Sequence, residues 1–323
     1  MNSRYQTIPK ELRYTRNQFD EEFPDDDTCL ERVMEMRFPG NMATCDSDDC
    51  AGKLRKHHRV SGRTAYACDN CGHHLYPLAG TIFEKSSTSL RVWFQAMYLM
   101  GSTRCGISAK QVQRETGVTY KTAWRMFRQI RSLLSEPDMQ LEGSTVEIDE
   151  TYVGGKRKNR HGSRGMRGRD NDEKTPVLGM VERGGRVIAQ VTPNVKAETV
   201  FPIIEEKVLP ESVVFTDEYS VYDRLATPAN RYQHRRIKHA EKVYVMGDVH
   251  TQTIEGFWSL VKRGIGGVYH SVSKKYLQTY LNEYSFRYNR RDSGNLIFFA
   301  ILAKVAETAS KSPVVANVQN QTV

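Results

Sequence analysis

The spacing of hydrophobic residues changes along the chain, and in its second half it predicts a mixed fold. Apolar runs and alternation of apolar and polar residues predict strands at 145–153, 177–182, 186–192, 212–216, 232–237 and 243–245. Arg183-Gly-Gly185 is expected to form a hairpin turn between the second and third of these strands. Helical spacing predicts helices at 197–209, 219–225, 251–263, 274–288 and 295–306. We therefore expect an α/β region in which a central sheet presents side chains at one edge.

The first half has helical spacing in three consecutive segments. Helices are predicted over 90–100, 108–116 and 119–134, and Thr116-Gly-Val-Thr119 forms a tight turn into the third. That helix carries basic side chains beside its apolar face, at Lys121, Arg125 and Arg128. The layout is that of a helix-turn-helix whose last helix lies in a DNA groove, and a plain three-helix bundle is the alternative.

Residues 1–36 give fewer signals. A short helix is expected near 28–36, and we expect the remainder, which includes the acidic run Asp20–Asp27, to be flexible. No chemistry is assigned to this segment.

Composition narrows the class of protein. Hydrophobic residues make up 39% and charged residues 26% of 323 residues, which fits a chain of two to three domains with real cores. Lys and Arg number 47 against 38 Asp and Glu, so the net charge is +9 and a polyanion such as DNA is the natural partner. We expect no membrane span and no signal peptide, and therefore a cytoplasmic protein.

Four of the six cysteines form two pairs, Cys45-x4-Cys50 and Cys68-x2-Cys71, separated by a β-type segment. In the cytosol such pairs indicate a structural zinc site rather than disulfides. Four nearby histidines are alternative ligands: His57, His58, His73 and His74. Cys29 and Cys105 are expected to be structural.

A loop over 156–174 is rich in Lys, Arg and Gly and has almost no apolar residues. Its first basic residues, Lys156, Arg157 and Lys158, suit a DNA phosphate backbone. A solvated insertion without this role is the other interpretation.

Three acids stand on different predicted elements. Asp149 and its neighbour Glu150 must point to opposite faces of the first strand, so only one can face a shared site. Asp217 ends the strand over 212–216, and Glu255 lies on the 251–263 helix, capped by Thr251 or Thr253. Converging carboxylates without a nucleophilic Ser or Cys suit two divalent ions that act on a phosphodiester.

The same helix presents a base. Lys262 lies two turns after Glu255, on one face with Ser259, where it can hold a DNA phosphate, and Arg263 follows it. The alternative is an ordinary surface helix on which this acid and lysine are merely exposed.

Several motifs together carry a resemblance. They are Gly80-Thr-Ile-Phe-Glu84, Tyr120-Lys-Thr-Ala-Trp124, Ile148-Asp-Glu-Thr-Tyr-Val-Gly-Gly-Lys156, His250-Thr-Gln-Thr-Ile-Glu-Gly-Phe-Trp258 and Phe286-Arg-Tyr-Asn-Arg-Arg291. From about Phe38 to Leu302 the chain resembles the ISXO-like group of bacterial insertion-sequence transposases. The resemblance implies a zinc ribbon, a ribonuclease H-like catalytic fold and two Mg²⁺ or Mn²⁺ ions. By motif position it implies Asp149, Asp217 and Glu255 as catalytic acids and Lys262 as the following lysine. The four-residue spacing of the first cysteine pair and the acidic N-terminal segment depart from the family pattern.

The resulting expectation is a multidomain α+β transposase that cleaves and joins double-stranded DNA at the ends of a mobile element. The expected segments are an N-terminal extension, a zinc ribbon, a helix-turn-helix domain, a catalytic domain with C-terminal helices and a tail, at 1–37, 38–84, 85–136, 144–311 and 312–323. We expect a homodimer or larger assembly on DNA, in a bacterial cytoplasm and associated with the nucleoid. Two alternatives are a non-catalytic DNA-binding regulator and a tyrosine recombinase using Tyr288 with His161 and Arg164.

Overall fold

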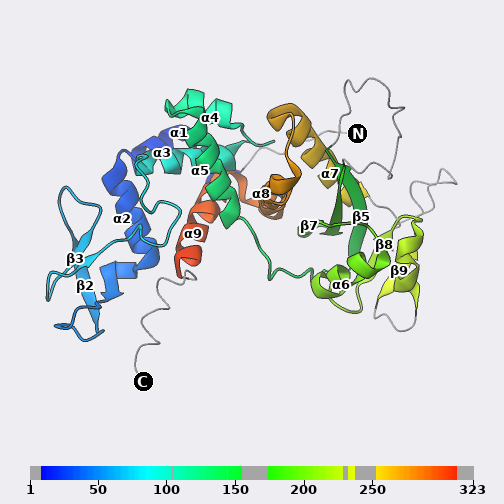
Figure 1. Cartoon of the computed structure of the whole chain (residues 1–323), viewed down its shortest axis with the longest axis horizontal. Coiled ribbons are helices and arrows are strands. Elements are labelled where there is room, and N and C mark those ends of the chain that lie inside the picture. Colours follow the sequence, from blue (N-terminus) through cyan, green and yellow to red (C-terminus); the bar gives the residue numbers. More distant parts are fainter. Residues whose placement is uncertain are drawn as a thin grey trace. The chain divides into compact units, whose positions relative to one another are not determined.

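The computed structural model describes residues 9–103, 105–143, 145–154, 174–227, 232–236 and 252–310. The chain divides into two compact units, which are Leu134–Arg291 and the combination of Met1–Leu133 with Asp292–Val323. In the described ranges no helix is both long and apolar enough to cross a membrane. The element labels below are those of Figure 1.

Six α-helices are described in the unit formed by the two ends of the chain. They are α1 (Arg16–Glu22), α2 (Asp26–Arg37), α3 (Leu90–Ser102), α4 (Ala109–Thr116), α5 (Tyr120–Leu133) and α9 (Ile297–Ser310). The Ser108 side chain caps α4 by accepting from the backbone of Gln111, and Gly117 ends it in the left-handed conformation with φ 73°. The helices predicted for 90–134 are therefore confirmed, whereas their use as a helix-turn-helix stays a prediction.

The C-terminal helix packs with the N-terminal helices of this unit. The Phe298 ring of α9 lies against Tyr14, Phe19, Phe23 and Phe94, with ring centroids 5.7–6.2 Å apart. Phe19 and Phe23 are almost fully buried, so the expectation that residues outside the 28–36 helix are flexible is wrong for α1 and the turn after it. Aromatic burial of this size holds the segment in place.

The acidic run Asp20–Asp27 is used within the same unit. Asp20 pairs with Arg91 of α3 at 2.5 Å, and Asp26 accepts a hydrogen bond from the Arg91 backbone at 2.8 Å. Asp25 caps α2 by accepting from the backbone of the helix's first turn. These acids join α1 and α2 to α3, which accounts for an acidic stretch in a basic protein.

A small antiparallel sheet follows α2. Its strands are β1 (Met42–Thr44), β2 (Leu54–Arg59), β3 (Tyr66–Cys68) and β4 (His74–Leu75), hydrogen-bonded in that order. Its centre contains few apolar side chains and is formed by the buried cysteines. So small a core needs another source of stability, which a metal held by these cysteines would supply.

The second unit is built on a five-stranded sheet in the order β7-β6-β5-β8-β9. The strands are β5 (Thr145–Val153), β6 (Thr175–Glu182), β7 (Val187–Val191), β8 (Val213–Thr216) and β9 (Gln233–Arg236). β5, β6 and β7 are antiparallel neighbours, while β8 runs parallel to β5 and β9 parallel to β8. The sheet is mixed, with β5 at its centre, as Figure 1 shows.

Helices cover both faces of this sheet. The even-numbered positions Val146 and Ile148 of β5 pack in one core with α6 (Ala197–Lys207) and the 3₁₀ segment η3 (Ser220–Ala226). The odd position Val153 packs in the other core with α7 (Gln252–Gly264) and α8 (Leu277–Asn289). Alternation along β5 therefore decides which helices each side chain meets.

One of the two N-cap candidates predicted for this unit is wrong. The helix predicted for 251–263 begins at Gln252, so Thr253 lies inside α7 and is not its N-cap. Three parts of the predictions lie outside the described residues, namely the other N-cap candidate Thr251, the strand at 243–245 and residues 156–173 of the basic loop.

Candidate catalytic site and metal centre

Asp149 lies in the middle of β5 and faces α7. The indole Nε1 of Trp258 on α7 donates a hydrogen bond to Asp149 Oδ2 at 3.1 Å. Gly179, opposite Asp149 on β6, makes room for that indole, because a Cβ at Gly179 would lie 2.3 Å from a Trp258 ring carbon. A glycine, a tryptophan and an acid on three elements therefore fit together at one point.

The carboxyl group of Asp149 lies in an environment that disfavours its charge. Its pKa is raised to about 7, chiefly by burial and also by repulsion from Glu150 and Asp217, against the lowering effect of the Trp258 hydrogen bond. A divalent cation would offset this cost, since opposite charge favours the ionised form. Such a perturbed acid is typical of a functional site.

Asp217 follows the end of β8, beside Asp149. The parallel pairing of β5 with β8 aligns Glu147 with Phe215, and the same register carried on by two residues would set Asp217 opposite Asp149. Tyr219 donates its backbone N–H to Asp217 Oδ1 at 3.0 Å, which fixes the carboxylate in the turn after the strand. The repulsion felt by Asp149 agrees with this close placement.

Glu255 lies on α7 one turn before Trp258, and its side chain is exposed. Since Trp258 reaches Asp149, the helix that carries Glu255 crosses the same face of the sheet. Ligand oxygens of the three acids do not all lie within 4.8 Å of one another, a spacing that only the cysteine group meets among the described residues. Two ions about 4 Å apart need a wider set of ligands than one ion does.

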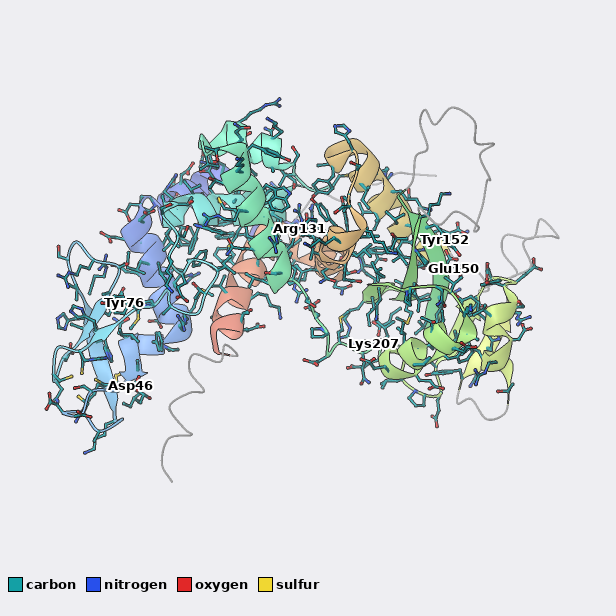
Figure 2. All side chains as sticks on the ribbon, in the orientation of Figure 1. Asp46, Tyr76, Arg131, Glu150, Tyr152 and Lys207 are labelled. Atoms are coloured by element: carbon teal, nitrogen blue, oxygen red, sulfur yellow. The ribbon has the colours of Figure 1, made fainter. Side chains whose placement is uncertain are left out.

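The neighbouring acid faces away, as strand geometry predicts. Glu150 accepts a hydrogen bond from the hydroxyl of Tyr222 at 2.9 Å, in the core formed with α6. Figure 2 labels Glu150 and Tyr152 along β5. The prediction that Asp149 and Glu150 point to opposite faces of the strand is confirmed.

The four cysteines predicted to bind zinc come together. The sulfur atoms of Cys45, Cys50, Cys68 and Cys71 lie within 4.8 Å of one another, with Cys45 and Cys71 at 3.5 Å and Cys50 and Cys68 at 3.8 Å. Tetrahedral zinc with 2.3 Å bonds to sulfur has S–S edges of about 3.8 Å, so the cluster fits this ion. The pKa of the Cys71 thiol is lowered to about 6, chiefly by the backbone N–H of His73, which favours the thiolate that zinc requires.

No histidine belongs to this cluster in the described residues. His57 is buried beside it but bonds the Arg55 carbonyl at 3.0 Å, and His58 pairs with Asp69 at 2.6 Å. Cys29 is buried alone, and burial raises the pKa of its thiol to about 12. The arrangement supports ligation by cysteines only, in spite of the wide spacing of the first pair.

The basic residues predicted to contact DNA fall into three groups. Lys121, Arg125 and Arg128 are exposed on α5, and Arg125 also bonds the Thr88 hydroxyl at 3.2 Å. Lys262 and Arg263 are exposed at the end of α7. The loop residues are outside the described part of the chain, and they are Lys156, Arg157 and Lys158.

Tyr288, the nucleophile of the recombinase alternative, packs as a structural aromatic. Its ring lies 5.4 Å from that of Phe257, and the Arg291 guanidinium lies 4.5 Å from its centroid. Its partners in that alternative, His161 and Arg164, are not among the described residues.

Sequence reasoning missed four residues at this site, namely Glu147, Gly179, Arg183 and Trp258. The signal for Glu147 was present, because a charged residue two positions before Asp149 on a buried strand must share its face. A glycine inside a buried strand likewise marks a close approach. The residues that Glu147 and Gly179 contact could not be predicted, because they lie on segments distant in the sequence.

A family model described as the ISXO2-like transposase domain matches residues 140–289, which include all three acids. An uncharacterized protein in transposable element ISH50 of Halobacterium salinarum is 32% identical over 232 residues, covering 69% of this chain and 77% of that protein. The chain belongs to the ISXO2-like transposase family.

A second relative of this transposase is shorter. An uncharacterized transposase-like protein of Haemophilus influenzae is 33% identical over 107 residues, covering 33% of the chain and 84% of that protein. Among solved structures, a chain from the crystal structure of a pre-cleavage Mos1 transpososome matches with 12% identity and a TM-score of 0.26, covering 67% of this chain and 75% of that one.

Proposed function

We propose that this protein is a metal-dependent DDE transposase that binds insertion-sequence ends, hydrolyses a phosphodiester to free a 3′-OH and joins that end to target DNA. The observation that carries the proposal is the meeting of Asp149 with Asp217 through the register of β5 and β8, under a helix that bears Glu255. Membership of the ISXO2-like family supports it.

The three acids are the proposed ligands of two Mg²⁺ or Mn²⁺ ions. Their hard oxygens suit these cations, with Asp149 central and Asp217 and Glu255 on either side. When bound, the ions activate the attacking oxygen and stabilise charge on the leaving oxygen. Lys262, exposed two turns after Glu255, binds a DNA phosphate and so orients the strand, with Arg263 beside it.

The remaining parts of the chain are proposed to recognise DNA. A zinc ribbon over 38–84 holds Zn²⁺ through its four cysteines, and a helix-turn-helix over 85–136 presents Lys121, Arg125 and Arg128 to the double helix. A mixed sheet with a central acid-bearing strand and helices on both faces supports a ribonuclease H-like catalytic fold. The basic loop at Lys156, Arg157 and Lys158 adds phosphate contacts.

Transposition requires that both element ends be held together, so we propose a homodimer or larger assembly on DNA. The net charge of +9 fits a protein associated with the nucleoid in a bacterial cytoplasm.

The test is strand transfer with labelled element ends and Mg²⁺. Wild type should nick and join the ends, whereas Asp149→Asn and Glu255→Gln should bind DNA and lose at least about 100-fold in rate. Glu205→Gln, an exposed glutamate of α6 on the other face of the sheet, is the matched control and should keep wild-type activity. DNA binding without metal-dependent nicking by wild type would instead indicate a regulator, and a covalent phosphotyrosine adduct a recombinase.

A further inference from the structure

Glu147 is a fully buried acid on the strand that carries Asp149. Its side chain is 0% exposed, and it lies two residues before Asp149 on the same face of β5. A charge removed from water is costly unless ion pairs and hydrogen bonds compensate for it. The partners of Glu147 therefore indicate what this position does.

Both carboxylate oxygens are engaged, and most of the bonds go to the start of α7. Glu147 Oε2 accepts the backbone N–H groups of Thr253 and Ile254 at 2.9 and 3.0 Å. Glu147 Oε1 accepts the Thr253 hydroxyl at 3.0 Å and Arg183 Nε at 2.9 Å.

These contacts make Glu147 a cap for α7. Thr253 and Ile254 are the second and third residues of the helix, whose N–H groups have no acceptor within it. An N-cap side chain next to the helix in sequence normally fills this role, but here a strand residue more than a hundred positions away does so. Its negative charge also suits the positive end of the helix dipole.

The same cluster also reaches β8, the strand that leads to Asp217. The guanidinium of Arg183 lies 4.3 Å from the ring centroid of Phe215 on β8, next to Glu147 in the sheet. Glu147, Phe215 and Thr253 each lie two residues before one of the three acids, in chain order Asp149, Asp217 and Glu255. One buried group thus connects the three elements, in each case at a residue two positions before the acid.

We propose that Glu147 is a positioning residue that sets the placement of Glu255 relative to Asp149 and Asp217 by capping α7. This inference rests on the proposed function, because it assumes that the three acids share metal ions. Loss of a residue that holds a metal ligand in place typically lowers metal affinity by about 10–100-fold.

The test is Glu147→Gln, which keeps the size of the side chain. The Gln oxygen can still accept the two backbone N–H groups, but its amide then faces the Arg183 N–H, donor against donor. Glu283→Gln is the matched control, since Glu283 is also 0% exposed, pairs with an arginine (Arg287, 3.3 Å) and accepts a hydrogen bond from Tyr269 at 3.3 Å.

We expect Glu147→Gln to raise the Mg²⁺ concentration for half-maximal cleavage roughly tenfold or more, with DNA affinity unchanged. Glu283→Gln should lower the Tm by about as much as Glu147→Gln does, and it should keep the wild-type Mg²⁺ dependence of cleavage. Equal Mg²⁺ dependence in the two variants would overturn the inference. If Glu147→Gln does not fold, Thr253→Val removes the hydrogen bond from the Thr253 hydroxyl, and its expected shift is about threefold in the same direction.

The inference and the proposed function can fail separately. If wild type cleaves no DNA, Mn²⁺ binding measured by electron paramagnetic resonance replaces cleavage as the readout. Weaker Mn²⁺ binding by Glu147→Gln than by Glu283→Gln supports the positioning role even then. Equal binding by these variants, or no binding by wild type, overturns it.

Discussion

Asp149→Asn should stabilise the protein when no divalent ion is added, although it should abolish activity. The carboxyl pKa rises from 3.8 to about 7 on folding, chiefly because the side chain is buried. A shift of about 3 units corresponds to about 4 kcal/mol for holding this group ionised in the folded state. Asparagine is neutral at every pH and still offers Trp258 an acceptor, so it avoids that cost.

The sign of the pH dependence follows from the raised pKa. The contribution of Asp149 to stability is fully present below the unfolded pKa near 4 and is lost as the pH rises through 7. The variant should exceed wild type by about 4 kcal/mol near pH 8, and by only about 1.5 kcal/mol near pH 5. Added Mg²⁺ should stabilise wild type at the higher pH and leave the variant unchanged.

The assay is urea unfolding of zinc-loaded protein with and without Mg²⁺ at both pH values. Replacing Trp93 and Trp124 by Phe leaves Trp258 as the fluorescent reporter, so the transition followed is that of the unit containing Asp149. A stability difference that does not change with pH, or a variant less stable than wild type near pH 8, would refute the reasoning.

Three further predictions concern separate parts of the molecule. Gly179→Ala should destabilise the protein by about 1–3 kcal/mol in urea and reduce cleavage, because its Cβ displaces the Trp258 indole; unchanged unfolding would contradict this. Cys68→Ser should lose zinc and expose the small sheet to protease, whereas Cys29→Ser should keep full zinc stoichiometry by metal analysis. Lys262→Ala should weaken DNA binding and reduce the slope of log affinity against log salt concentration by about one. An unchanged slope would argue against a contact between Lys262 and a phosphate.

Local signals in the sequence predicted much of the fold. Helix ends followed their caps, as at Ser108 and Gly117, and the Arg183-Gly-Gly185 turn joins β6 to β7 as expected. Strand alternation also predicted that Asp149 and Glu150 face opposite ways. These predictions are correct because each depends on residues that are close together in the chain.

Long-range contacts were beyond such reasoning. The packing of Phe298 on the N-terminal helices joins segments almost 300 residues apart, and no local pattern announces it. Glu147 was visible as a charge on a buried strand, but its partner Thr253 could be found only in three dimensions. The predicted domain boundaries stay a prediction, and α9, assigned to a catalytic region ending at 311, packs with the N-terminal unit.

The central claim is that Asp149, Asp217 and Glu255 together hold two divalent ions at one phosphodiester. The most direct measurement is anomalous X-ray scattering from Mn²⁺ in crystals of the protein bound to element-end DNA. The account predicts two peaks about 4 Å apart, both bound by Asp149, with Asp217 on one and Glu255 on the other. A fully assembled complex with Mn²⁺ elsewhere, or with the three carboxylates too far apart to share the pair, would contradict it.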